Sequence, residues 1–565
     1  MAYDLVIRGG TVIDGSGADR KRADIAVMGG QIAEIGAVRD GGVRELDASG
    51  LMVTPGFIDG HTHFDAQIFW DGLGQSASLH GVTTCVMGNC GFTLAPSPAE
   101  KKDLAIRSIE RAEDISREDM MVGVPWTWNT YADYLQTIDG LPKGINFAGY
   151  IGHSALRDFV MGERAFTDPA TDEDIEAMQA EIRDALRAGA IGFSTSQIAQ
   201  HRTVDDGPVA SKVGSWNEVF ALARVLGELG AGNFQASADI GDPEMQQQLV
   251  RIALATRRPV HFPWVYAEQR PDGWRMGASF FEEVEAGGGS GVGQVHVREL
   301  QNVIGFRVGL PYDRLPRWSD FRKRPLDEQL AVLREPGARQ ELVEEALHGP
   351  YVVSNVAAEV QARLPDYERL LALLSPTGPR PSVAELARQQ GKTPVDVLID
   401  LSLEADFNQF FTQPFANQDE TVVEVLLRHP RSIIAQSDSG AHVSQIMDSS
   451  IPTYFLAHWV RERQAFTWEE AVAMLTSRPA AGLGIPGRGL LQEGYAADVV
   501  ILDADRVGPR LPHAVTDLPA GGTRLVQEAE GIHATVVNGE ILLQDGTFTD
   551  ARPGQLVRGP LAAGR

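Results

Sequence analysis

The middle of the chain repeats one local pattern, in which a glycine separates an amphipathic segment from a short apolar run. In one clear case Thr171 is placed to cap a helix whose apolar residues recur three and four positions apart, and Gly189 ends that helix before the next apolar run. Helix, glycine and buried strand make up the αβ half of a βαβ unit. Eight apolar runs fit the strand position, at 55–63, 81–90, 145–151, 190–195, 233–238, 259–266, 293–297 and 432–436. Eight such units predict an α/β fold, a TIM-like (β/α)₈ barrel with its chemistry at the carboxyl ends of the strands.

The two ends of the chain consist of short strand-like segments separated by turns. Gly29-Gly30 near the start and Asn538-Gly539 near the end are two-residue hairpin signals. Each end is too small to form a good core alone. We therefore expect one small β-sandwich domain built from residues 1–54 and 483–557, with the barrel occupying 55–482.

The barrel segment is longer than its fold requires, since roughly 250 residues are typical of a (β/α)₈ barrel. The excess falls at about 298–431, a mostly helical and loop-rich stretch with several prolines. We expect an insertion there, positioned over the barrel mouth, where it could act as a lid.

Composition excludes several classes of protein. The 565 residues carry a formal net charge of −26, which argues against nucleic acid as a partner. No run of about eighteen apolar residues is present, so we expect no membrane span. Two cysteines, Cys85 and Cys90, cannot form a disulfide framework, and the start of the sequence does not resemble a signal peptide, so we expect a cytoplasmic protein. A homo-oligomer is compatible with these features.

His61 and His63 end the first apolar run, in the sequence Pro-Gly-Phe-Ile-Asp-Gly-His-Thr-His. Residues two apart in an extended strand point to the same face. Two imidazoles that converge at a barrel mouth suit a divalent metal such as zinc. The alternative is a pair of ordinary polar loop residues, and the buried strand that precedes them favours the metal.

Cys90 and Asp438 follow two other predicted strands. A thiolate at the barrel mouth is a strong zinc ligand, and Cys90 is flanked by glycines that permit close approach, whereas Cys85 lies inside its strand and fits a buried structural thiol. Asp438 could bind the metal and accept a proton from metal-bound water. Its Ser-Asp-Ser-Gly setting is also ordinary turn chemistry. Together with His61 and His63 these residues predict a metal site.

These motifs resemble the amidohydrolase superfamily, and most closely its N-acyl-D-amino-acid deacylase branch. The resemblance covers nearly the whole chain. It rests on Leu-Val-Ile-Arg-Gly-Gly-Thr-Val-Ile-Asp-Gly near the start, the segment 55–63, Gly-Val-Thr-Thr followed by Gly-Asn-Cys-Gly, the segments 152–157 and 190–195, Ser437-Asp438, and the segment 494–500.

The resemblance implies a metal-dependent barrel plus a β-sandwich that hydrolyses an amide. It places His61, His63 and Asp438 at one metal position, and Cys90 at a second position or as a bridge. The fifth and sixth strands of the family usually each supply a metal-binding histidine. Here the fifth strand has no histidine, and His261 falls early in the sixth strand. The sequence is therefore compatible with either one or two zinc ions. The fourth strand ends in Ser194-Thr195 and not in a lysine, which argues against a two-metal site built on a carbamylated lysine.

Four further residues are candidates for substrate binding. His153 follows the third strand, with a structural histidine as the alternative. His201 and Arg202 lie in the loop after the fourth strand. Arg202 could bind a substrate carboxylate. The alternative is that both are ordinary solvent-exposed loop residues. His442 follows Asp438 by four residues and could orient it or contact substrate.

We therefore expect a zinc-dependent hydrolase in which metal-bound hydroxide attacks the amide carbonyl of an N-acyl amino acid. Asp438 would take the proton of the water and pass it to the leaving nitrogen. The D-configuration of the substrate comes from the resemblance. Within enzymes, the alternative is another amide, a cyclic amide or a carbamate. A different alternative is an inactive barrel that serves as a binding or assembly module, which the retention of all four ligands opposes.

Overall fold

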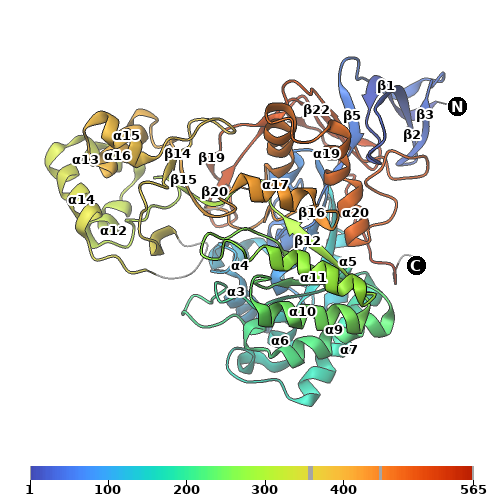
Figure 1. Ribbon diagram of the computed structural model, residues 1–565, viewed down its shortest axis with the longest axis horizontal. Helices are drawn as coiled ribbons and strands as arrows, with labels where there is room; N and C mark the ends of the chain where they lie inside the picture. The colour runs from blue at the N-terminus through green and yellow to red at the C-terminus, as the bar shows by residue number, and fades with distance from the viewer. Residues whose placement is uncertain (1, 354–359, 445–447, 563–565) are drawn as a thin grey trace.

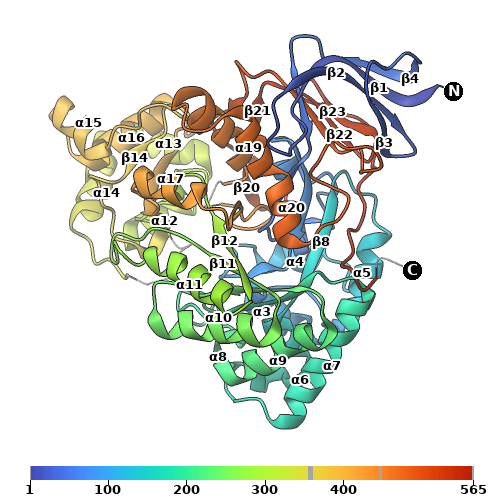
Figure 2. The ribbon, with the colours of Figure 1, turned by 45° about the vertical axis from the view of Figure 1, so that its right-hand side comes forward.

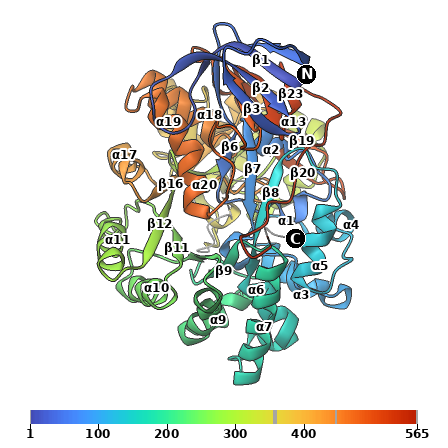
Figure 3. The ribbon, with the colours of Figure 1, turned by 90° about the vertical axis from the view of Figure 1, so that its right-hand side faces the viewer.

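A computed structural model describes residues 2–353, 360–444 and 448–562 of the chain. Within them, eight parallel strands form a nearly closed barrel in the order β16-β12-β11-β10-β9-β8-β7-β6 (Figure 3). The strands are β6 (Phe57–Asp59), β7 (Val82–Met87), β8 (Asn146–Gly152), β9 (Gly192–Ser196), β10 (Asn233–Ser237), β11 (Pro259–Pro263), β12 (Ser290–Val295) and β16 (Ser432–Ile434). Each of the eight predicted runs contains or overlaps one of these strands, so the predicted barrel is confirmed.

Helices surround the strands on the outside (Figure 3). Those that follow the strands include α1 (Phe64–Gln67), α3 (Lys102–Ile109), α5 (Tyr131–Asp139), α6 (His153–Met161), α7 (Asp172–Ala188), α9 (Trp216–Leu229), α10 (Pro243–Thr256), α11 (Arg275–Ala286), α17 (Glu420–Arg428), α19 (Trp468–Leu475) and α20 (Ser477–Leu483). Helix α7 shows how the sequence sets these boundaries. Thr171 and Asp174 form a capping box at its start, and Met178, Ile182 and Leu186 bury one face.

Strands from both ends of the chain form one mixed sheet of nine strands within the described residues. The order is β24-β23-β22-β17-β5-β1-β2-β3, with β4 paired to β1; the bounds are β1 (Tyr3–Val12), β2 (Lys21–Met28), β3 (Gln31–Gly36), β4 (Gly42–Asp47), β5 (Met52–Pro55), β17 (Val499–Leu502), β22 (Ile532–Val537), β23 (Glu540–Gln544) and β24 (Thr547–Phe548). Antiparallel pairing of β5 with β17 joins the two ends. This confirms a small β domain drawn from both termini (Figure 1).

A separate unit lies between β12 and β16. It contains the three-stranded sheet β13-β15-β14 and several helices: β13 (Leu300–Ile304), β14 (Leu371–Ala372), β15 (Phe411–Ala416), α12 (Pro316–Arg322), α13 (Leu326–Arg334), α14 (Pro336–His348), α15 (Val383–Gln390) and α16 (Pro394–Glu404). It has its own apolar core, in which Phe306 stacks on Phe407 at 4.3 Å between ring centroids. The unit projects from the barrel away from the nine-stranded sheet (Figures 1 and 2).

None of the helices in the described residues combines the length and the apolar character that a membrane crossing needs.

Candidate metal centre

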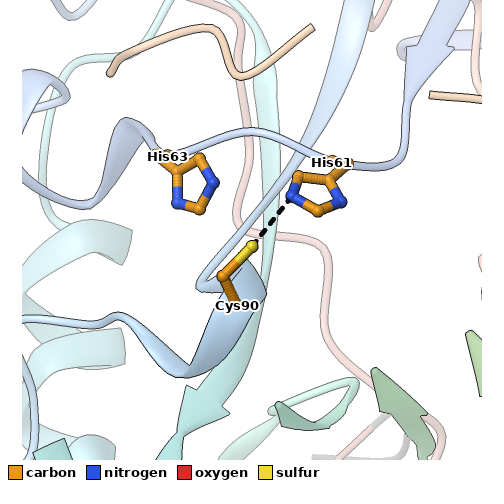
Figure 4. Close-up of side chains that lie close together, drawn as sticks. All are labelled: His61, His63 and Cys90. Atoms are coloured by element: carbon orange, nitrogen blue, oxygen red, sulfur yellow. Dashed lines mark hydrogen bonds between the residues drawn. The ribbon is translucent and has the colours of Figure 1, made fainter. Parts of the chain in front are cut away.

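His61 and His63 follow β6 and present their rings to the same space at the carboxyl end of the barrel (Figure 4). The ring centroids lie 5.4 Å apart. Both residues lie beyond the end of β6, so this closeness does not come from the strand geometry on which the prediction was based. Nδ1 of His61 pairs with Oε1 of Gln294, on β12, at 2.9 Å. Because an amide oxygen only accepts, this contact places the hydrogen on Nδ1 and leaves the Nε2 lone pair of His61 free to bind a metal.

Cys90 reaches the two histidines from the turn after β7. Its φ of 56° lies in the left-handed region, so the turn bends sharply and brings Sγ within 3.2 Å of Nε2 of His61 (Figure 4). Ser237, at the end of β10, donates its hydroxyl hydrogen to Sγ at 2.9 Å, and Oε1 of Gln235 accepts from the backbone N–H of Cys90 at 2.8 Å. Burial raises the pKa of the Cys90 thiol, and the hydrogen bond from Ser237 acts in the opposite direction.

Asp438 completes the set of donor atoms. The ligand atoms of His61, His63 and Cys90 all lie within 4.8 Å of one another, and all three residues are buried. Oδ1 of Asp438 lies 3.4 Å from Nε2 of His61 and 3.6 Å from Nε2 of His63. Two ligands of a tetrahedral zinc ion are about 3.3 Å apart. The imidazole, thiolate and carboxylate donors therefore fit a zinc site in both chemistry and spacing.

The loop that carries Asp438 is held against the end of β6 by backbone hydrogen bonds. The N–H of Asp438 donates to the carbonyl oxygen of His61 at 3.2 Å, and the N–H of His63 donates to that of Ser439 at 2.9 Å. Gly440 has a φ of +96°, and a Cβ at this position would lie 2.8 Å from the backbone of His63. The Ser-Asp-Ser-Gly sequence is thus a turn that also delivers a donor atom.

The charges of these side chains suit metal binding. Burial lowers the pKa of His61 and His63, because it disfavours the charged imidazole. Burial acts to raise the pKa of Asp438, but its hydrogen bond with His63 and its attraction to the neighbouring histidines outweigh this and hold the pKa below its usual range. Neutral imidazoles and an ionised carboxylate are the forms that bind a metal.

Glu113 lies beside this cluster and was not predicted from the sequence. Its side chain is buried, and Oε2 is 3.5 Å from Nε2 of His63 and 3.5 Å from Nε2 of His442. Burial raises the pKa of Glu113 well above its usual range. Nothing in its local sequence marks it, because it lies among other acidic residues after α3, far along the chain from His442. The contacts of Gln235, Ser237 and Gln294 with the cluster were not predicted either. The one sequence feature that could have indicated them is the presence of these polar residues within otherwise apolar strands.

His442 and His201 border the cluster. Nε2 of His442 is 4.0 Å from Oδ2 of Asp438. Nδ1 of His201 pairs with Oγ of Ser196 at 2.7 Å, and its ring lies 5.1 Å from that of Phe92. Burial, then repulsion from His442 and His63, lowers the pKa of His201 to about 3. His442 therefore lies directly beside the cluster, and His201 lies within range of the charges of its histidines.

The other two predicted substrate contacts are placed differently. His153 is fully buried at the start of α6, where Nε2 donates to Oε1 of Glu218 at 2.9 Å and Nδ1 pairs with Oγ1 of Thr195 at 2.9 Å. Both ring nitrogens are engaged, which favours the structural alternative for this residue. Arg202 donates from Nη1 to the carbonyl oxygen of Asp206 at 2.9 Å, a contact within its own loop.

Comparison with known proteins identifies the family to which the chain belongs. The amidohydrolase family matches residues 44–543, which is most of the chain. The chain belongs to the amidohydrolase family. This confirms the resemblance found in the sequence and the enzyme class that it implies.

Relatives within this amidohydrolase family align along almost the whole chain. A D-aminoacylase of Alcaligenes xylosoxydans xylosoxydans is 29% identical over 562 residues, covering 98% of this chain and 97% of that protein. An N-acyl-D-aspartate deacylase of the same organism is 29% identical over 564 residues, covering 98% and 95%. A solved structure of D-aminoacylase, concerned with the functional role of its binuclear metal centre, is 25% identical with a TM-score of 0.66 and covers 98% of this chain and 100% of that one.

The fifth and sixth strands of this amidohydrolase end without histidine, as their sequences indicated. Gln235 on β10 pairs in register with His261 on β11. Two residues further along, where each strand ends, the chain has Ser237 and Pro263. His261 therefore lies two residues below the level at which Ser237 contacts Cys90.

Proposed function

We propose that this amidohydrolase is a zinc-dependent enzyme that hydrolyses the amide bond of N-acyl-D-amino acids. The observation that carries the proposal is the convergence of His61, His63, Cys90 and Asp438 at the carboxyl end of the barrel. The two deacylase relatives, each aligned over 98% of this chain, support the substrate class.

In this proposal His61, His63, Cys90 and Asp438 hold the zinc ion. Zinc, when bound, acts as a Lewis acid toward the scissile carbonyl and activates water for attack. Gln294 fixes the tautomer of His61, and Ser237 orients the sulfur of Cys90.

Asp438 moves the proton. Its Oδ1 faces the two histidines, so Oδ2 is the atom that accepts the proton of the attacking water. Addition of the water oxygen to the carbonyl carbon and cleavage of the C–N bond leave a carboxylic acid, and Oδ2 returns the proton to the departing amine nitrogen. In this proposal His201 and His442 contact the substrate beside the cluster; the separation of 4.0 Å between Nε2 of His442 and Oδ2 of Asp438 supports this role for His442.

The setting of the enzyme is also part of the proposal. We infer a reducing, cytoplasmic compartment, which the two free cysteines support, because a ligand thiolate must stay reduced. The acidic net charge of −26 supports a small-molecule substrate rather than nucleic acid. The domain boundaries at 54/55 and 482/483 and the insertion at about 298–431 remain predictions.

A substrate panel tests the proposal. Hydrolysis is measured with the metal-free enzyme and with the zinc-reloaded enzyme. The substrates are N-acetyl-D-amino acids, their L-enantiomers, aryl amides, cyclic amides and carbamates. We expect the highest kcat/KM for an N-acetyl-D-amino acid, loss of turnover on metal removal and recovery with zinc. Preference for a cyclic amide or carbamate would favour the other hydrolase alternative, and a zinc-loaded protein without turnover would favour the binding module.

A further inference from the structure

A hairpin from the C-terminal part of the chain reaches the loops at the carboxyl end of the barrel. It consists of β19 (His513–Thr516) and β20 (Thr523–Val526), which pair antiparallel. In the sequence this C-terminal hairpin lies between β17 and β22, two strands of the nine-stranded sheet. In space it lies beside β14 and β15 (Figure 1), where Leu525 packs with Val303 and Phe410. The C-terminal hairpin therefore connects the β domain with the unit between β12 and β16.

An ion pair joins the C-terminal hairpin to the segment that carries His61 and His63. Nη1 of Arg524 lies 3.4 Å from Oδ2 of Asp71, which follows His63 after helix α1, and the two side chains are only 6% and 4% exposed. Nε and Nη2 of Arg524 donate to the two carboxylate oxygens of Asp517 at 2.8 and 2.9 Å, which fixes the plane of the guanidinium. Because a buried carboxylate is costly unless it is paired, Arg524 holds Asp71 against the hairpin.

Two further hydrogen bonds join the C-terminal hairpin to the segments that follow β7 and β16. The backbone N–H of Ala520, in the turn between β19 and β20, donates to Oδ1 of Asp119 at 2.7 Å. The backbone N–H of Leu525 donates to the carbonyl oxygen of Val443 at 2.7 Å. The segment after β7 carries Cys90, and Val443 lies in the loop of Asp438. The hairpin thus contacts all three segments that carry the proposed zinc ligands.

We propose that the C-terminal hairpin holds these three segments in register at the metal centre, with Arg524 as a positioning residue. The inference rests on the proposed function, because it concerns the ligands proposed there. The three segments follow different barrel strands, and metal ligands must stay within about 0.5 Å of their productive geometry. One element in contact with all three segments limits their independent movement. Arg524 acts through Asp71 and through the shape of the hairpin.

Three variants test this role, namely Arg524→Gln, the double variant Arg524→Gln/Asp71→Asn, and Arg488→Gln as the matched control. Arg488 is similarly buried, with a side chain 9% exposed, and it pairs with the buried Asp498, which directly precedes β17. Arg524→Gln leaves the charge of Asp71 without its cation, whereas the double variant removes both charges and should be the more stable of the two.

The measurements are thermal unfolding, zinc affinity by competition with a chromophoric chelator, kcat at saturating zinc, and hydrogen exchange read by mass spectrometry. We expect Arg524→Gln and the double variant to bind zinc about tenfold more weakly than wild type and to lose about tenfold or more in kcat. Their backbone should exchange faster in residues 61–75 and 436–444. Arg488→Gln should lower the melting temperature and leave the other three quantities close to wild type.

Contrary results would identify a different role for the pair. Wild-type zinc affinity and exchange in the double variant would show that Arg524 and Asp71 contribute only to stability, which overturns the inference. An equal loss of zinc affinity in Arg488→Gln would also overturn it, because the effect would then follow from destabilisation alone. If Arg524→Gln does not fold, the double variant provides the measurement.

Failure of the proposed function is distinguishable from failure of this inference. A wild type that binds no zinc would refute the proposed function. Hydrogen exchange, which needs neither zinc nor turnover, would then decide the role of the hairpin. Faster exchange in the double variant than in Arg488→Gln would support that role, and equal exchange would overturn it.

Discussion

The hydroxyl of Ser237 donates a hydrogen bond to the sulfur of Cys90 at 2.9 Å. A residue at the end of the fifth barrel strand thus contacts a proposed metal ligand that follows the second strand. A hydrogen bond to a thiolate favours the ionised form, which is the form that binds zinc. In the proposed site, Ser237 would therefore act on a bound metal through Cys90.

Removal of this hydroxyl should weaken zinc binding. We expect Ser237→Ala to lower zinc affinity about 10- to 100-fold, as is typical when a partner of a metal ligand is lost. Ser237→Thr keeps the hydroxyl and should retain an affinity close to wild type. Competition with a chromophoric chelator measures both variants. Equal affinities in wild type and Ser237→Ala would show that the hydrogen bond does not contribute.

Asp438→Asn should remove proton transfer while His61, His63 and Cys90 still bind zinc. The amide has nearly the size of the carboxylate but does not accept the proton of water at neutral pH. We expect kcat to fall about 10²- to 10⁴-fold at saturating zinc, the range of general acid–base catalysis. Zinc content is measured on the same sample. Turnover at the wild-type rate with zinc bound would exclude Asp438 as the proton carrier.

Gly440→Ala should displace the loop that carries Asp438. The added Cβ would lie 2.8 Å from the backbone of His63, which has no flexible end that could move aside. We expect zinc affinity to fall at least about tenfold and stability to fall by roughly 1–3 kcal/mol.

Gly484→Ala is the matched control for this loop. Its φ of +68° carries a similar backbone penalty, but no atom lies within 4 Å of the new Cβ. We expect it to lose stability without losing zinc affinity. Thermal unfolding and chelator competition measure the two quantities. If both variants bind zinc as wild type does, the close contact between Gly440 and His63 does not position Asp438.

The buried cluster of Glu218, Arg157 and His153 should make the folded protein less stable at acidic pH. Nη1 of Arg157 donates to both carboxylate oxygens of Glu218 at 2.6 and 2.7 Å. Burial acts to raise the pKa of Glu218, but its hydrogen bond with His153, and then the charges of His153 and Arg157, lower it to about 2. Because the folded pKa is depressed, this stability is present above the usual value of about 4.5 and is lost as pH falls toward 2.

Glu218→Gln isolates this contribution. We expect it to destabilise the protein by roughly 3 kcal/mol at pH 7, with the difference from wild type shrinking below pH 4.5. Glu228→Gln, an exposed residue on the same helix α9, should change stability by less than about 1 kcal/mol at either pH. Urea unfolding from pH 7 to pH 3 measures all three proteins. A Glu218→Gln difference that stays constant with pH would contradict the assignment.

Much of the barrel follows from local sequence. The runs at 81–90 and 145–151 contain strands β7 and β8, and every residue of both strands is buried. Such runs are recognisable because strands buried on both faces read as continuous apolar segments bounded by turns. The interpretation of Cys85 as a structural thiol also agrees with its full burial within β7. The three-stranded sheet after β12 was not predicted, because β14 has only two residues and its pairing partners are distant in sequence.

The sequence by itself determined the barrel, the β domain drawn from both ends, and the pairing of His61 with His63. The barrel and the β domain depend on periodicity along neighbouring residues, which sets the direction of side chains on a strand. His61 and His63 lie beyond the end of β6, so only their two-residue separation in the chain, and not strand geometry, keeps them close. Only the tertiary structure brought Glu113 to His63 and His442, Ser237 to Cys90, and His153 to Glu218. These contacts join segments that are far apart in the chain, so they depend on how the loops and helices pack around the barrel, which local spacing does not encode.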